Sequence, residues 1–194
     1  RLIPTLTIPY IAGLTPPNWE VTFADDNYGE VDPDATPDLV AISVNTMAAH
    51  RSYALADAFR ARGIAVVLGG WHVTFCPDEA APHADAVVVG EADDTWVGLL
   101  GDFERGELKP RYTSRNDTDL AHYPPVRRPL LAGRQYFTSN LVQATRGCPY
   151  RCNFCSVWTF YKGKTRQMTP ARVIDDIKAV ETDHITFVDD NFLM

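Results

Sequence analysis

The sequence predicts an α/β protein in which a parallel sheet fills the N-terminal region and a second β/α unit begins near the C-terminal end. Three observations predict this class. Short apolar runs alternate with helical patterns between residues 20 and 106. A polar stretch rich in proline and arginine interrupts the alternation, and a strand–helix–strand pattern then follows. We therefore expect domains over residues 1–106 and 140–194, joined by a linker over 107–139.

The first region alternates strands with helices. A helical pattern over residues 55–62 ends at Gly63, and apolar residues repeat at i, i+3, i+4 and i+7 over 96–103. A shorter helix over residues 10–14 precedes them. This alternation is typical of a flavodoxin-like (Rossmann-like) doubly wound sheet, whose first strand we expect to be missing here. The expected strands are Val21–Ala24, Leu39–Val44, Ile64–Leu68 and Ala86–Val89.

The last region contains one β/α/β step. An apolar run over residues 141–144 leads into a cysteine-containing loop, and Thr169 with Pro170 opens a helix that continues to Val180. Residues 185–188 form the next expected strand. This order is the beginning of a β/α barrel, for which a full eightfold form needs roughly 250 residues. The region therefore supplies only the first part of a barrel.

Composition indicates a folded protein. Hydrophobic residues make up 45% and charged residues 22% of the 194 residues. The sequence has neither an apolar run of about 20 residues nor a basic-then-apolar leader, which favours a cytoplasmic protein with no transmembrane segment. Because Arg1 opens the sequence and Met194 closes it directly after an apolar run, we expect a piece of a longer protein. Such a piece is not expected to turn over substrate by itself.

Positive charge is concentrated in one segment. Residues 105–172 hold 13 of the 18 Lys and Arg residues and only three acidic residues, although the net charge of the chain is −7. Such a segment can bind nucleic acid, face the carboxylate of an anionic cofactor, or form a solvated surface. Charge alone does not decide among these three roles. Of the three, nucleic-acid binding is the one that we do not expect.

Three of the four cysteines lie within eight residues, at Cys148, Cys152 and Cys155. Their spacing, C-x3-C-x2-C, is too tight for an ordinary disulfide framework and suits one shared ligand in a reducing compartment. Three thiolates can bind three irons of a [4Fe-4S] cluster and leave the fourth iron open. The alternative is a structural zinc site with His122 or His184 as the fourth ligand.

This segment, Arg146-Gly-Cys-Pro-Tyr-Arg-Cys-Asn-Phe-Cys155, resembles the radical S-adenosylmethionine (SAM) superfamily. The resemblance implies that the cysteines bind a [4Fe-4S] cluster, that SAM occupies its open iron, and that electron transfer then yields a deoxyadenosyl radical. It also implies that Phe154 lies near the adenine of SAM.

The end of the last strand, Asp189-Asp190-Asn191, resembles the position where this superfamily contacts the SAM amino group. Many members have Gly-Gly-Glu there, so the resemblance does not assign individual roles to these three residues. Carboxylates at the carboxyl end of barrel strands are well placed for a bound ammonium group. The alternative is that these side chains cap backbone groups in a turn.

Three segments of the N-terminal region resemble the cobalamin-binding domain that is fused to many radical SAM enzymes. The segments are Asp38-Leu-Val-Ala-Ile-Ser43, Leu68-Gly-Gly-Trp-His-Val-Thr74 and Asp85-Ala-Val-Val-Val-Gly-Glu91. Ligands of such sheets bind beyond the carboxyl ends of the strands. The resemblance therefore implies cobalamin contacts there, for which the candidates are Ser43, Asn45, Gly69, Gly70, His72, Gly90 and Glu91.

The histidines and the remaining cysteine receive more modest roles. The Asp-x-His-x-x-Gly motif that supplies a lower cobalt ligand does not occur, and His72 is interpreted as a loop residue near the site. His50 and His83 are interpreted as surface residues, and Cys76 as a small apolar filler.

These resemblances imply a cobalamin-dependent radical SAM enzyme that methylates an unactivated carbon of a lipid or another small molecule. An electron donor such as flavodoxin or ferredoxin would be its partner. Radical cyclisation or rearrangement is one alternative, and a tRNA methylthiotransferase is another, although Cys76 alone cannot provide the second cluster of that family. The alternative without catalysis is a zinc-dependent RNA-binding module.

Overall fold

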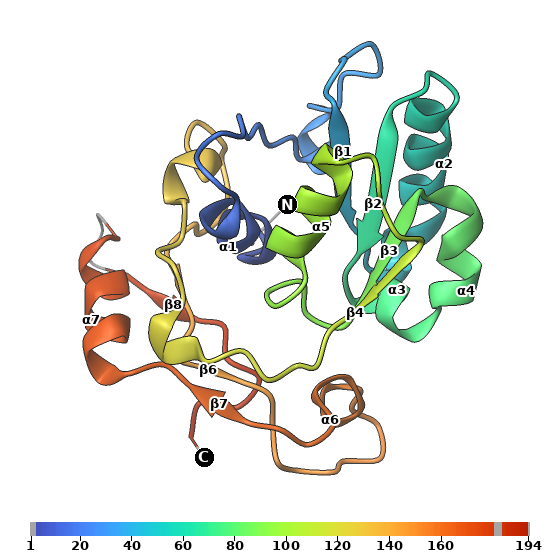
Figure 1. Cartoon of the computed structure of the whole chain (residues 1–194). Helices are drawn as coiled ribbons and strands as arrows, with labels where there is room; N and C mark the ends of the chain where they lie inside the picture. Colours follow the sequence, from blue (N-terminus) through green and yellow to red (C-terminus); the bar gives the residue numbers. More distant parts are fainter. Residues whose placement is uncertain (1–2, 181–183, 194) are drawn as a thin grey trace. The chain divides into compact units, whose positions relative to one another are not determined.

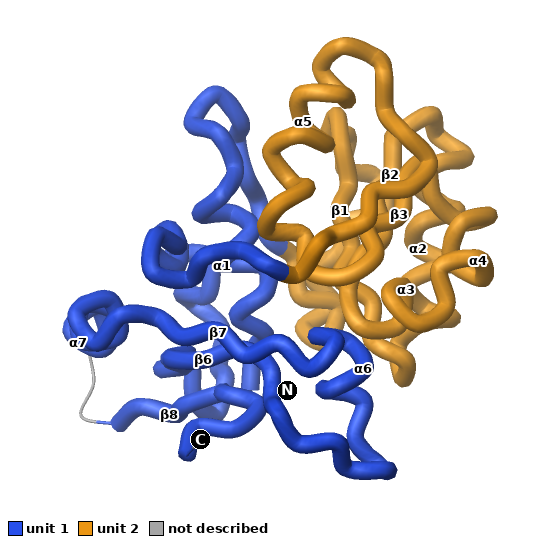
Figure 2. Tube along the Cα trace, turned by 60° about the horizontal axis from the view of Figure 1, so that its bottom comes forward, with its two compact units in different colours: residues 1–23, 117–194 blue, residues 24–116 orange. Residues whose placement is uncertain are grey.

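The structure, a computed structural model, describes residues 3–180 and 184–193. The chain divides into two compact units, shown in different colours in Figure 2. The sheet unit comprises Ala24–Asn116, and the cysteine unit combines Arg1–Phe23 with Asp117–Met194. The first residues of the chain thus group with its C-terminal part. This division differs from the boundaries suggested by composition.

Four parallel strands in the order β1-β2-β3-β4 form the sheet. Leu39 pairs with Ala65 at one end of the first pair, and Ser43 pairs with Gly69 at the other. All carboxyl ends therefore meet at one edge of the sheet. The strands are β1 (Leu39–Ser43), β2 (Ala65–Gly69), β3 (Ala86–Val89) and β4 (Arg111–Thr113).

Helices cover both faces of this sheet (Figure 1). The helices α2 (Ala49–Arg60), α3 (Trp71–Phe75) and α4 (Pro77–Ala80) lie on one face, and α5 (Trp96–Glu104) lies on the other. This arrangement explains why β2 and β3 are almost continuously apolar, since strands buried on both faces lose the alternating pattern. Short 3-10 helices complete the unit: η1 (Asp26–Tyr28), η2 (Thr46–Ala48) and η3 (Ala81–His83).

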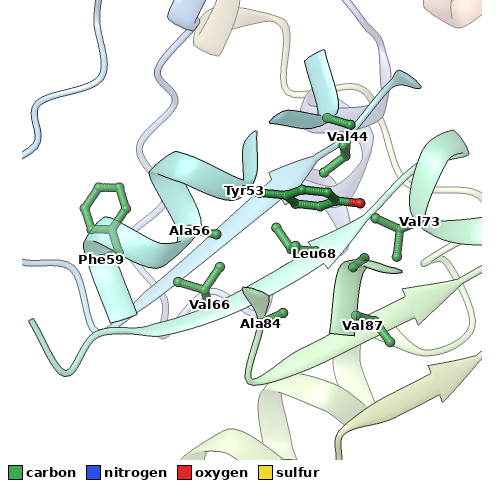
Figure 3. Packing of buried hydrophobic residues seen from close by; sticks show 11 residues of the cluster. Val44, Tyr53, Ala56, Phe59, Val66, Leu68, Val73, Ala84 and Val87 are labelled. Carbon is green, nitrogen blue, oxygen red and sulfur yellow. The ribbon is translucent and has the colours of Figure 1, made fainter. Parts of the chain in front are cut away.

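The core of the sheet unit forms where α2 packs on the strands (Figure 3). Tyr53, Ala56 and Phe59 repeat at helical spacing on the buried side of α2. They pack with Val66 and Leu68 of β2, which are fully buried. The three predicted strands and two predicted helices of this unit that follow residue 38 are confirmed, although α2 begins six residues before the expected helix of residues 55–62.

One predicted strand is wrong, and one strand of the four-stranded sheet was missed. The structure gives no strand at residues 21–24, where Arg134 instead donates from Nη2 to the Phe23 carbonyl at 2.8 Å. A β-strand forms only where its backbone groups bond to a neighbouring strand. Here the Arg134 side chain bonds to the Phe23 carbonyl instead. In the supposed linker, β4 pairs with β3 because Tyr112 is buried and its hydroxyl donates to Asp102 at 2.9 Å.

The cysteine unit contains one parallel and one antiparallel strand pair. Strand β5 (Leu141–Val142) pairs in parallel with β8 (Thr186–Phe187), and α7 (Pro170–Lys178) lies between them in the sequence. This is the expected first β/α/β step. Strands β6 (Thr145–Arg146) and β7 (Arg166–Gln167) pair antiparallel. The other elements are α1 (Thr7–Leu14), η4 (Leu120–His122), η5 (Arg128–Leu131) and α6 (Val157–Tyr161).

The supposed linker supplies much of the core of this unit. Leu120, Tyr123 and Val126 pack with Tyr10 of α1 and Leu141 of β5. The rings of Tyr10 and Tyr123 meet edge to face with centroids 4.9 Å apart. Residues 117–131 are therefore packed structure and not a flexible connection.

Part of the concentrated positive charge serves this packing. The carboxylate of Asp176 on α7 is buried and pairs with Arg172 at 3.2 Å and with Arg128 at 3.6 Å. Arg172 also donates to the carbonyls of Tyr123 and Pro124. Buried charges require such partners. These arginines thus hold α7 against the segment before β5, a use that charge counting does not reveal.

Candidate cofactor sites

The three clustered cysteines lie in a loop that the β6–β7 hairpin closes. Residues 147–165 form the loop, because Thr145 pairs with Gln167 and Arg146 pairs with Arg166. Cys148 and Cys155 are half-buried, and Cys152 is exposed. The amide of Cys155 donates to the carbonyl of Cys152 at 3.2 Å, which forms a tight turn between these two ligands. The hairpin therefore presents all three thiols on one loop.

Two residues before the first cysteine fix the start of this loop. Arg146 is buried, and its guanidinium lies 4.7 Å from the ring centroid of Tyr123 and 5.3 Å from that of Tyr10. Gly147 has a φ of 85°, and a Cβ there would lie 2.1 Å from the Lys164 carbonyl oxygen. Only glycine permits this approach.

The strand-end acidic residues contact the backbone of the same loop. Asp189, which follows β8, accepts hydrogen bonds from the amide of Ala144 at 3.1 Å and from the amide and hydroxyl of Thr145. Asp190 accepts from the amide of Gly147 at 2.8 Å. These contacts match the turn-capping alternative, since both carboxylates bind backbone donors.

Asn191 and Phe154 differ in their surroundings. The amide nitrogen of Asn191 lies 3.7 Å from the sulfur of Cys148, so this side chain reaches the first of the three clustered cysteines. Phe154 is 88% exposed, and the neighbouring Tyr150 is 60% exposed. An exposed aromatic ring beside a ligand loop is available to stack on a planar group.

The structure brings the candidate cobalamin residues to one edge of the sheet unit. Ser43 and Gly69 end β1 and β2, while Gly90 follows β3 directly. Exposure separates this set into two groups. Ser43 and Asn45 are exposed, whereas His72 and Glu91 are less than 9% exposed. The first group is therefore better placed to touch a ligand than the second.

The glycines of this edge have a structural reason of their own. Gly70 has a φ of 96°, and a Cβ there would lie 2.8 Å from the Val44 carbonyl oxygen. A Cβ on Gly90, with a φ of 89°, would lie 2.7 Å from Oδ1 of Asn116. Close packing between neighbouring strand ends thus requires both glycines.

Sequence reasoning missed several residues at the same edge. The hydroxyl of Thr74 donates to the Gly70 carbonyl at 2.8 Å and accepts from the Gly90 amide at 3.0 Å, so it joins two strand ends. Asn116 accepts from the amide of Glu91 at 3.1 Å. Thr74 lies in one of the segments that resemble the cobalamin-binding domain. Asn116 lies in the expected linker, where no sequence pattern marks it.

His72 belongs to a group of side chains that includes Cys76. Its Nε2 lies 3.1 Å from Oε1 of Glu79, and its Nδ1 lies 3.3 Å from the hydroxyl of Thr46. The Tyr53 hydroxyl donates to the same Glu79 oxygen at 3.2 Å. The hydrogen bond from His72, followed by that from Tyr53, holds the pKa of the Glu79 carboxyl below its ordinary value. Burial, followed by this hydrogen bond, raises the pKa of Tyr53 to about 12.

Family models match both parts of the chain. A B12-binding domain model matches residues 3–100, and a radical SAM superfamily model matches residues 142–194. The chain belongs to the radical SAM enzymes that carry a B12-binding domain. Their two domains imply cobalamin, SAM and a [4Fe-4S] cluster as cofactors.

Similar proteins of this radical SAM family include several methyltransferases. The chain is 37% identical to the bacteriochlorophyllide d C-8(2)-methyltransferase of Chlorobaculum tepidum, over 85% of this chain and 38% of that protein. It is 30% identical to the C-12(1)-methyltransferase of the same organism, over 96% and 43%. The hopanoid C-2 methylase of Rhodopseudomonas palustris is 29% identical over 94% and 36%. The chain thus spans 36–43% of the length of these relatives.

In the described part of this radical SAM protein, the three cysteines do not gather around a single metal position with either histidine of the zinc alternative. Each cysteine of a [4Fe-4S] site binds a different iron, so the sulfurs need not converge on one point. Over residues 3–180 and 184–193, the three cysteines form no group with His122 or His184 whose ligand atoms lie within 4.8 Å of one another. Nδ1 of His122 instead lies 2.8 Å from Oδ2 of Asp119.

Among residues 3–180 and 184–193, no helix is long and apolar enough to span a membrane.

Proposed function

We propose that the full-length protein is a cobalamin-dependent radical SAM methyltransferase that methylates an unactivated carbon of a large apolar metabolite. The observation that carries this proposal is the similarity to named C-methyltransferases, which extends over 85–96% of this chain and so includes both domains. Relatives that act on bacteriochlorophyllides and hopanoids favour a pigment or lipid substrate.

When bound, the cluster and SAM supply a deoxyadenosyl radical that removes a hydrogen atom from the substrate, and methylcobalamin supplies the methyl group. Cys148, Cys152 and Cys155 would hold the cluster. Phe154 is proposed to stack on the adenine of SAM, in keeping with its high exposure. Ser43 and Asn45 are proposed to contact cobalamin at the carboxyl edge of the sheet, together with the backbone of Gly69 and Gly70.

For the strand-end residues, we propose a division of roles. Asp189 has three hydrogen-bond donors from the loop before Cys148 and acts as a positioning residue. Asp190 is exposed and Asn191 reaches Cys148, so these two side chains remain candidates for SAM contact. The Asp190 carboxylate is proposed to receive the ammonium group of SAM on its exposed side while it keeps the hydrogen bond from the Gly147 amide.

Two further proposals concern the surroundings of the enzyme. A cluster held by three thiolates, one of them exposed, requires a reducing compartment, and we propose the cytoplasm. An electron must reach the cluster from outside the chain, for which we propose a small electron carrier such as flavodoxin or ferredoxin.

The test uses the full-length protein, isolated without oxygen from cells supplied with cobalamin and incubated with SAM that carries a deuterated methyl group. Candidate substrates are bacteriochlorophyllide and hopanoid extracts. A product in which a CD3 group replaces one hydrogen of the substrate, absent with Cys152→Ala, supports methyl transfer. Deoxyadenosine with an unlabelled cyclised product would contradict it and favour cyclisation, which a magnesium-protoporphyrin cyclase relative, 28% identical over 61% of this chain, makes the second candidate.

A further inference from the structure

We propose that His72, Cys76 and Glu79 form a zinc site in the sheet unit, separate from the cluster cysteines. Their imidazole nitrogen, thiol sulfur and carboxylate oxygen all lie within 4.8 Å of one another. Histidine nitrogen, cysteine sulfur and carboxylate oxygen are the three ligand types that zinc uses in proteins. This site is independent of the proposed methyl transfer.

Local structure brings the three ligands together. The amide of Cys76 donates to the carbonyl of His72 at 2.8 Å, so the two residues are one helical turn apart at the end of α3. Residues four apart on a helix lie on the same side. Pro77 then starts α4, and Glu79 on its first turn points back to His72 at 3.1 Å. A contiguous segment of eight residues therefore supplies all three ligands.

Two residues behind these ligands orient them. The hydroxyl of Thr46 lies 3.3 Å from Nδ1 of His72, which leaves Nε2 directed toward Glu79. The hydroxyl of Tyr53 donates to Glu79 at 3.2 Å. Histidine and carboxylate ligands of metals are commonly held by such outer hydrogen bonds. The arrangement thus includes outer partners for two ligands before any metal binds.

The dimensions and accessibility suit a zinc ion. Zinc–nitrogen and zinc–sulfur distances of roughly 2.0–2.3 Å place neighbouring tetrahedral ligands about 3.3–3.8 Å apart. Because the ligand atoms lie within 4.8 Å of one another, a contraction of at most about 1.5 Å reaches this spacing. His72 is buried, whereas 55% of the Glu79 side chain is exposed, so the ion can enter from the Glu79 side and keep water as a fourth ligand.

The site would have a structural consequence. Because it joins the end of α3 to α4, the ion would fix the segment that follows Gly69 and Gly70 at the carboxyl edge of the sheet. His72 would then be a zinc ligand and could not also serve as a lower ligand of cobalt. Cys76 would have a chemical role in place of that of an apolar filler.

The test uses the 194-residue chain with Cys148, Cys152 and Cys155 all replaced by Ser, so that only Cys76 offers a thiolate. Chelator-treated protein is titrated with Zn²⁺ and, separately, with Co²⁺ as a spectroscopic probe. We expect one equivalent to bind, with thiolate-to-cobalt charge-transfer absorption. Adding Cys76→Ser removes this absorption. His72→Ala or Glu79→Gln weakens binding by about 100-fold, and Thr46→Ala by about 10-fold.

His122→Ala is the matched control, because it removes an exposed histidine of the cysteine unit whose Nδ1 lies 2.8 Å from Oδ2 of Asp119, outside the group. Circular dichroism without metal verifies that each variant is folded, and the conservative Cys76→Ser change protects the comparison if His72→Ala unfolds. Binding that is equal in Cys76→Ser and the parent, or no binding below millimolar Zn²⁺, would overturn the proposal and leave only a hydrogen-bonded cluster.

Discussion

Replacing Asp189 with Ala should loosen the backbone that leads into the cysteine loop. The carboxylate accepts three hydrogen bonds from Ala144 and Thr145. Hydrogen bonds to a charged group contribute about 1.5 kcal/mol or more each, but in the variant water can reach the amide of the half-buried Ala144, whereas Thr145 is buried. We therefore expect a local loss of about 2–4 kcal/mol. Asp189→Asn keeps one carbonyl acceptor without the charge and should lose about half as much.

Amide hydrogen exchange reads this effect at the donors themselves. A loss of 2–4 kcal/mol corresponds to exchange of the Ala144 and Thr145 amides that is faster by about 30- to 700-fold. Asp175→Ala is the control, because Asp175 lies on the exposed side of the neighbouring helix α7. The same variants are then reconstituted with iron and sulfide and titrated with SAM.

The two possible roles of Asp189 predict different results for amide exchange and for cluster stability. A positioning residue predicts faster exchange, a less stable cluster and weaker SAM binding together in Asp189→Ala, with partial recovery in Asp189→Asn. A residue that only contacts SAM predicts weaker SAM binding with an intact cluster. Unchanged exchange at Ala144 and Thr145 in Asp189→Ala would refute the positioning role.

Three further substitutions test the surroundings of the loop. Gly147→Ala should destabilise the cysteine unit by about 3 kcal/mol or more in thermal unfolding and prevent cluster assembly, because its Cβ would meet the Lys164 carbonyl; normal assembly would contradict the geometry. Thr169→Ala removes the side-chain cap of α7 and should cost about 1 kcal/mol, whereas Thr169→Ser should not. Burial, followed by the charge of Asp176, raises the pKa of Tyr10 to about 12. The protein should therefore keep this contribution to its stability up to about pH 10 and lose about 3 kcal/mol as the pH rises toward 12. Tyr10→Phe should remove this alkaline dependence in pH-dependent unfolding, and an unchanged pH profile would refute the assignment.

Local patterns were sufficient where an element is long and its burial is regular. The apolar runs of β2 and β3 and the helical spacing of α2 and α5 predicted these elements before their partners were known. The cysteine spacing likewise indicated the cluster loop, since all its ligands lie within eight residues. In these cases neighbouring residues carry the whole signal.

Other features depend on contacts between distant residues. Strand β4 has three residues and β6 has two, too few for a pattern, and each exists because a partner strand pairs with it. The contact between Asp189 and Thr145 joins residues 44 apart, and that between Thr46 and His72 joins residues 26 apart. Composition assigned residues 117–131 to a linker. It could not show that these residues complete a core, because their packing partners lie far away in the sequence, in α1 and β5.

The central claim is that one protein holds both an iron-sulfur cluster on Cys148, Cys152 and Cys155 and a corrinoid on the sheet unit. The most direct test is the absorption spectrum, with iron, sulfide and cobalt analysis, of the full-length protein purified without oxygen from cobalamin-supplied cells. We predict four irons and one corrinoid per chain, with Cys152→Ala losing the cluster and keeping the corrinoid. Full iron content in Cys152→Ala, or iron-sulfur absorption without any corrinoid in the parent, would contradict the claim.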